Sequence, residues 1–125
     1  MLIPEDLKYT EEHEWIKIEG DIGIVGITDY AQDQLGDIVY FELPVIGKKI
    51  KKGETVCVVE SVKSASDIYS PVTGEVIEIN EKVKVTPETV NKNPYNDGWL
   101  FKIKLSNIDE INDLLTPSKY RELIE

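Results

Sequence analysis

The sequence predicts a mainly β protein with short accessory helices and a helical C-terminus. Short runs of β-branched and apolar residues recur along the chain, several of them alternating with polar residues. Glycine, aspartate and proline separate these runs, as turns between strands require. After residue 106 the apolar residues are spaced as on a helix. With 125 residues the chain is long enough for one domain with a modest core.

The first two long strands are predicted to form a hairpin. Apolar and polar residues alternate in Glu14–Glu19, and a second apolar run follows in Ile22–Ile27. Gly20 and Asp21 supply turn residues between them. We therefore expect an antiparallel start to the sheet.

A short helix is predicted next, over residues 30–35. Thr28 or Asp29 can cap its start, because a side-chain oxygen there accepts a hydrogen bond from a free amide of the first turn. Gly36 can end the helix in the left-handed conformation. A further strand is expected over residues 37–43.

Lys63 lies in a segment that is predicted to be a hairpin tip. It stands between two β-type runs, residues 55–59 and residues 74–79. Residues 36–39 and 74–77 also resemble each other, because in each a glycine and an acid lead into a strand. Such a repeat suits a flattened barrel of two similar halves joined at Lys63. The basic stretch between Gly47 and Gly53 is interpreted as a turn with solvated lysines.

The C-terminal part is predicted to combine one strand with helices. Residues 87–91 can form a helical turn, residues 93–98 a loop, and residues 99–105 a strand. Ser106 or Asn107 can then cap a helix, and Pro117 can open a last helical segment up to Ile124. One face of the first helix carries apolar residues that are expected to pack on the barrel: Ile108, Ile111, Leu114 and Leu115.

The net charge of −10 excludes some classes of partner. Nucleic acids and anionic membranes require a basic surface, so neither is an expected partner. No stretch has the character of a secretory signal, a transit segment or a membrane span, and a cytoplasmic location is expected. Cys57 is the only cysteine, and its apolar neighbours predict a buried, inert thiol.

Motifs of enzymes are scarce. His13 is the only histidine, and no plausible cysteine nucleophile stands near it in the sequence. There is no phosphate loop, no dinucleotide motif and no spacing of His and Cys that would bind a metal. We therefore predict no catalytic residues, no metal site and no autonomous enzyme activity.

Several separated motifs, in the same order, resemble those of the glycine cleavage H-protein family. They are His13-Glu14-Trp15, residues 26–37 (GITDYAQDQLGD), residues 42–44 (ELP), the segment around Lys63, and residues 91–99 with Pro94-Tyr95 and Gly98-Trp99. Biotin-carrying domains place methionines beside their lysine, whereas Lys63 is flanked by Val62 and Ser64. Val62 also argues against the lipoyl domains of acyltransferases, which usually carry aspartate there.

The resemblance implies a barrel-sandwich hybrid, the flattened β-barrel of lipoyl and biotinyl domains. Residues 1–125 would form a single lipoyl-carrier domain, with a helical segment over about residues 107–125. Lipoic acid would be attached covalently to Lys63 as N6-lipoyl-lysine, with the protein as tether and the cofactor as the reactive part.

The resemblance also implies a reaction cycle. Glycine decarboxylase, a pyridoxal phosphate enzyme, would load an aminomethyl group onto the arm of Lys63. Aminomethyltransferase would remove this group, and dihydrolipoyl dehydrogenase would reoxidise the dithiol. A monomer is expected, because the arm must reach several large enzymes in turn.

Further site residues are implied by the resemblance alone. Glu60 and the turn at Gly53 would help the lipoylating enzyme recognise the domain. Glu14 and Asp67 stand where the family keeps acids for a cleft that shelters the cationic aminomethyl arm. Glu12 and Gln34 stand where other members carry serine and histidine.

Two alternatives share these motifs. One is a lipoyl relay that passes lipoyl groups to other lipoyl-dependent enzymes. The other is a scaffold of the same fold in which Lys63 remains a free amine.

Overall fold

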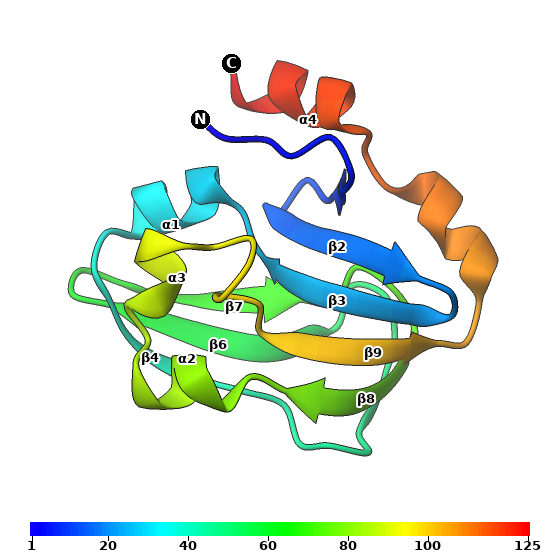
Figure 1. Ribbon diagram of the computed structural model, residues 1–125, viewed down its shortest axis with the longest axis horizontal. Helices are drawn as coiled ribbons and strands as arrows, with labels where there is room; N and C mark the ends of the chain where they lie inside the picture. Colours follow the sequence, from blue (N-terminus) through cyan, green and yellow to red (C-terminus); the bar gives the residue numbers. More distant parts are fainter.

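The computed structural model describes residues 1–125 and contains two antiparallel sheets (Figure 1). The six-stranded sheet has the order β1-β2-β3-β9-β8-β5, and the three-stranded sheet has the order β4-β6-β7. The strands of the larger sheet are β1 (Lys8–Tyr9), β2 (Glu14–Glu19), β3 (Ile22–Ile27), β9 (Phe101–Leu105), β8 (Gly74–Ile79) and β5 (Lys49–Ile50). Those of the smaller sheet are β4 (Ile38–Glu42), β6 (Thr55–Ser61) and β7 (Ala65–Tyr69). The mainly β architecture is confirmed, as two sheets without a closed barrel.

Short helices lie around the sheets. They are α1 (Asp29–Leu35), α2 (Glu81–Val85), α3 (Thr89–Lys92), the 3-10 helix η1 (Ile108–Asp113) and α4 (Pro117–Ile124). Thr28 caps α1 by accepting a hydrogen bond from the amide of Ala31 at 3.1 Å. Gly36 ends α1, as the sequence predicts, with a positive φ of +78°, but its ψ of −152° differs from that of the left-handed helical conformation.

Two apolar clusters hold the fold together. The main cluster contains 18 buried residues from both sheets and from α2 and α3. A second cluster packs the C-terminal helix onto the outside of the larger sheet and consists of Ile3, Leu7, Tyr9, Trp15 and Tyr120. In Figure 1 the N-terminal segment and α4 lie next to each other above β2. No helix is both long and apolar enough to cross a membrane.

The hairpin around Lys63 differs from the prediction in its second strand. The partner of β6 is β7, whereas β8, which covers residues 74–79, pairs with β9 and β5 in the other sheet. Strand β7 has almost no apolar signal, because Ile68 is its only buried residue. Its pairing with β6 is a tertiary property that local periodicity does not report.

Smaller differences also have local causes. Strand β5 lies inside the stretch that was interpreted as a basic turn, because Ile50 is buried. Strand β9 begins at Phe101 and not at residue 99, since the side chain of Asn80 binds the carbonyl of Trp99 at 2.7 Å.

The segment from residue 107 to the C-terminus is helical, as predicted, but its first part is a 3-10 helix and not an amphipathic α-helix. Asn107 caps it, accepting a hydrogen bond from the amide of Asp109. Ile111 and Leu114 pack partly on the main cluster, whereas Ile108 is 51% exposed. Leu115 packs partly on the second cluster, so three of the four apolar residues expected on this face are partly buried, and only Ile108 in the first turn is not.

Candidate functional site

Lys63 lies at the tip of the β6–β7 hairpin, and its side chain is exposed. The hydroxyl oxygen of Ser61 accepts hydrogen bonds from the amides of Lys63 and Ser64, at 3.4 and 3.2 Å. The amide of Ser61 donates to the carbonyl of Ser64 at 2.8 Å, and the amide of Val62 donates to the carbonyl of Asp37 at 2.9 Å. The hairpin tip is thus tied both internally and to the strand beside it. These bonds hold the backbone from which the side chain of Lys63 extends.

The aliphatic stem of Lys63 lies against Gly36, at the end of α1. A Cβ atom at Gly36 would lie 3.5 Å from Cε of Lys63 and 3.9 Å from its Nζ. Asn91 of α3 fixes this corner, since its amide nitrogen donates to the carbonyl of Gly36 at 2.8 Å and its side-chain oxygen accepts from the amide of Ile38 at 3.0 Å. Sequence reasoning assigned Gly36 only as a helix stop and gave Asn91 no role, because both contacts arise from tertiary packing.

A cavity of about 170 Å³ opens beside α1 and the hairpin. We call it the Glu14 cleft. Its lining brings together Glu14, Asp67, Glu12 and Gln34 with apolar side chains that include Leu35. Glu14 comes from β2 and Asp67 from β7, two strands that are far apart in the sequence. The two acids that the resemblance implied for a cleft therefore do line one cavity. Leu35, which lines the same cavity, directly precedes Gly36 in the sequence.

Glu14 is the buried acid of this cleft, with 2% of its surface exposed. One carboxylate oxygen accepts a hydrogen bond from the hydroxyl of Thr10, and the other accepts from the amide of Tyr69 at 3.2 Å. Burial raises the pKa of Glu14 to about 7, and the two hydrogen bonds oppose this rise. Asp67, in contrast, is exposed. A cation that enters the cleft would meet one carboxylate at the surface and a second one inside.

The raised pKa of Glu14 predicts a pH-dependent stability. Because the pKa rises from 4.5 to about 7 on folding, the folded protein binds this proton more tightly than the unfolded chain. The resulting stabilisation is complete below pH 4.5 and is lost as the pH rises through 7. Relative to Glu14→Gln, the wild-type free energy of unfolding should fall by up to about 3 kcal/mol over this range. Urea unfolding at several pH values measures the difference.

The matched control is Glu11→Gln, which changes an exposed acid that neither lines the cleft nor contributes to the raised pKa of Glu14. This variant should keep the pH dependence of the wild type. A difference between wild type and Glu14→Gln that stays constant with pH would contradict the assigned burial of Glu14.

The two residues implied in recognition by a lipoylating enzyme lie far apart. Glu60 is exposed on β6, three residues before Lys63, and pairs with Tyr40 and Ala65 on the neighbouring strands. Gly53, with φ of +86°, lies in the turn before β6. The 7 residues of β6 separate this turn from the hairpin tip, a span of about 23 Å. Glu60 is therefore placed beside Lys63, and Gly53 is not.

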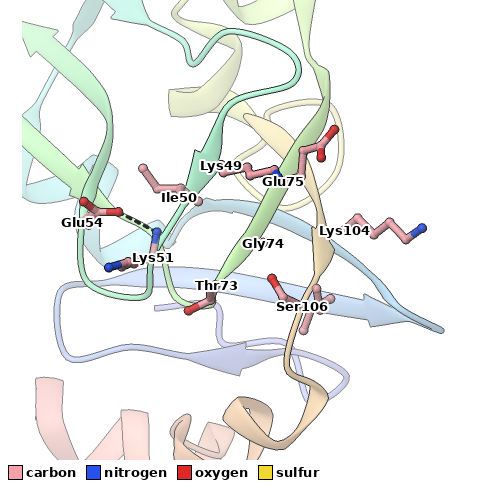
Figure 2. Close-up of a pocket in the computed structure, with 10 residues that line it drawn as sticks. Lys49, Ile50, Lys51, Glu54, Thr73, Gly74, Glu75, Lys104 and Ser106 are labelled. Carbon is pink, nitrogen blue, oxygen red and sulfur yellow. Dashed lines mark hydrogen bonds between the residues drawn. The ribbon is translucent and has the colours of Figure 1, made fainter.

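A larger cavity, of about 480 Å³, has Lys51, Glu54 and Thr73 in its lining (Figure 2). Glu54 directly follows Gly53 in the sequence. Across the strands Lys49 pairs with Glu75 and Glu75 with Lys104, so charges of opposite sign alternate. Figure 2 shows the side chains of Lys51 and Lys104 pointing to different sides. The carboxylate of Glu54 accepts a hydrogen bond from the backbone amide of Lys51 at 2.7 Å. The amines do not converge on one point, which favours solvated lysines over an anion site.

The remaining reactive side chains are structural. Cys57 is buried, as predicted, and burial raises its pKa to about 12. His13 lies 2.9 Å from the hydroxyl of Tyr120 through Nδ1, and burial lowers its pKa. No group of three or more His, Cys, Asp or Glu side chains could hold a metal ion.

Comparison with known proteins connects this geometry to a family. Residues 7–125 match the model of the glycine cleavage H-protein. The glycine cleavage system H protein of Carboxydothermus hydrogenoformans is 54% identical over 124 residues, which cover 99% of this chain and 95% of that protein. The H protein of Thermus thermophilus is 54% identical over 125 residues, covering 100% and 98%. The crystal structure of a glycine cleavage system H protein from Mycobacterium marinum matches with a TM-score of 0.88 at 39% identity, covering 96% of this chain and 97% of that one.

Proposed function

The chain belongs to the glycine cleavage H-protein family, and we propose that it is a lipoyl carrier of that system, with lipoic acid joined through an amide bond to Nζ of Lys63. The observation that carries this proposal is the position of Lys63. Its exposed amine stands on a rigid hairpin tip, and its stem contacts the end of the helix that lines the Glu14 cleft. Residues 1–125 act in this proposal as one lipoyl-carrier domain, a cytoplasmic monomer without enzyme activity of its own.

The residues present fit such a group. Acylation removes the charge of Lys63, and the amine is free to react because it is exposed and makes no ion pair within 4.0 Å. When bound, a lipoyl group supplies a dithiolane that can take up a one-carbon amine and two electrons. The protein orients this arm and offers a cleft with two acids and apolar walls. A carboxylate facing an ammonium stabilises it and a cleft that excludes water protects it.

The proposed partners follow from the cycle. Glycine decarboxylase would load the aminomethyl group, aminomethyltransferase would accept it, and dihydrolipoyl dehydrogenase would take the electrons. A lipoylating enzyme would install the arm. Each partner must approach the hairpin tip, which is free of helices on its outer side (Figure 1).

A loading assay tests the function. Lipoylated protein is incubated with glycine and purified glycine decarboxylase, and the release of carbon dioxide and the mass of the protein are followed. One carbon dioxide per lipoylated chain, with a matching gain in mass, is expected. Lipoylated protein that cannot be loaded but donates its lipoyl group to other enzymes would instead be a relay.

Charge reversal at Glu60 tests the recognition of the domain by the lipoylating enzyme. Glu60 is exposed and three residues from Lys63, so Glu60→Lys should leave the fold intact. We expect it to lower the rate of lipoylation about tenfold, since one reversed contact changes an interface by about 1–2 kcal/mol. Intact-protein mass after timed reaction with the purified enzyme measures this rate. The control is Glu122→Lys, an exposed acid of α4 that makes no ion pair, and equal rates for both variants would exclude Glu60 from recognition.

A further inference from the structure

The C-terminal helix contributes one polar contact to the corner where the Glu14 cleft begins. Tyr120 of α4 is completely buried, and its ring stacks on Tyr9 with 4.6 Å between centroids. Its hydroxyl shares a hydrogen bond of 2.7 Å with the hydroxyl of Thr28 and lies 2.9 Å from Nδ1 of His13. Thr28 is itself completely buried. The hydroxyl of Tyr120 thus contacts both Thr28, 92 positions away in the sequence, and His13, 107 positions away.

Both partners of Tyr120 belong to elements that form the cleft. Thr28 caps α1, which supplies Ala31 and Leu35 to the lining. His13 directly precedes Glu14, and its φ of +70° is the only positive φ at a residue other than glycine. The carbonyl of His13 also accepts a hydrogen bond from the amide of Thr28 at 3.0 Å. The start of β2 and the start of α1 are therefore fixed to each other at this point.

The hydrogen bonds of this corner form a consistent chain. The hydroxyl oxygen of Thr28 already accepts from the amide of Ala31, so its proton is available for the oxygen of Tyr120. The proton of Tyr120 is then available for His13. Burial lowers the pKa of His13, which favours the neutral ring whose Nδ1 can accept. Each buried polar atom has a partner, as a polar contact in such a place requires.

We propose that Tyr120 is a positioning residue for the carrier function. By holding Thr28 and His13 together, its hydroxyl sets the separation between α1 and Glu14, and with it the closure of the cleft around the loaded arm. This inference rests on the proposed function, and it assigns to the C-terminal helix a role in protecting the arm, although Tyr120 is not among the residues that line the cleft.

The first test uses unmodified protein and therefore does not depend on lipoylation. Two amides report the local geometry: Ala31, which donates to Thr28, and Tyr69, which donates to Glu14. In Tyr120→Phe, hydrogen exchange of both amides should become about tenfold faster than in the control variant, because local opening needs less free energy. Exchange of core amides in β3 and β9 gives the change in global stability, which is subtracted.

The matched control is Tyr9→Phe. Tyr9 is also completely buried in the same cluster, and its hydroxyl donates to the carbonyl of Pro4 at 2.7 Å, away from the cleft. Thr28→Val breaks the proposed contact from the other side and keeps the inference testable if Tyr120→Phe does not fold. Because this variant also removes the acceptor of the Ala31 amide, only the amide of Tyr69 is its reporter.

The second test uses lipoylated protein that has been loaded with glycine and glycine decarboxylase. Without aminomethyltransferase, ammonia should be released several-fold faster from Tyr120→Phe than from Tyr9→Phe. Equal exchange in the two variants, or faster exchange with an unchanged rate of ammonia release, would overturn the inference. Failure of all variants and the wild type to load would refute the proposed function instead, while the exchange experiment would still decide whether Tyr120 positions the cleft.

Discussion

Replacing Lys63 with arginine is expected to abolish loading by glycine decarboxylase completely. Arginine keeps the positive charge and the length of the side chain, but its guanidinium is not acylated by lipoylating chemistry. Lys63 is exposed and makes no ion pair, so the free energy of unfolding should change by less than about 0.5 kcal/mol. Carbon dioxide release in the loading assay measures the first effect, and urea unfolding measures the second.

The control for this variant is Lys104→Arg, an exposed lysine of β9 in the other sheet. It should be lipoylated and loaded like the wild type. Loading of Lys63→Arg at the wild-type level would show that the carrier chemistry lies elsewhere. A folded but inactive Lys63→Arg protein would separate the attachment site from the scaffold that presents it.

Gly74→Ala is expected to have the largest effect on stability. Gly74 lies where β8 meets both β5 and β9, opposite Ile50 and Leu105. A Cβ atom there would lie 2.1 Å from the carbonyl oxygen of Lys104. Because that atom belongs to the backbone, no change of rotamer can relieve the contact, and the strands must separate. We expect a loss of at least about 3 kcal/mol in the free energy of unfolding, or failure to fold.

Urea unfolding of Gly74→Ala is compared with that of Glu75→Ala. Glu75 is the next residue of β8 and is exposed, so its truncation should change stability by less than about 0.5 kcal/mol. Equal stabilities of the two variants would contradict the close approach of β8 and β9. The result bears directly on the two-sheet arrangement that places the hairpin of Lys63 beside α1.

Local sequence patterns were sufficient for much of this fold. The hairpin of β2 and β3 has clear alternation and turn residues, and α1 has both of its caps, Thr28 and Gly36. Strand β7 has no such pattern of alternating apolar and polar residues, because Ser66 and Asp67 are polar and exposed. Its position is determined by pairing with β6, a contact that a period of two in the sequence cannot report.

The candidate site shows the same division. The position of Lys63 at a hairpin tip was predicted from the β-type runs on either side of it, whereas Glu14 and Asp67 came from the resemblance to a family. No local pattern could bring these two acids together, since they lie on β2 of one sheet and β7 of the other. The contacts of Gly36 with Lys63 and of Tyr120 with Thr28 were not predicted for the same reason.

The attachment of lipoic acid to Lys63 is tested most directly by the mass of the intact protein, followed by peptide mapping, after expression in cells supplied with lipoic acid. The exposed hairpin tip and the family membership predict a gain of one lipoyl group, located on the peptide that contains Lys63. An unmodified Lys63 in the presence of a competent lipoylating enzyme would contradict the carrier function, and a lipoyl group on another lysine would contradict the site.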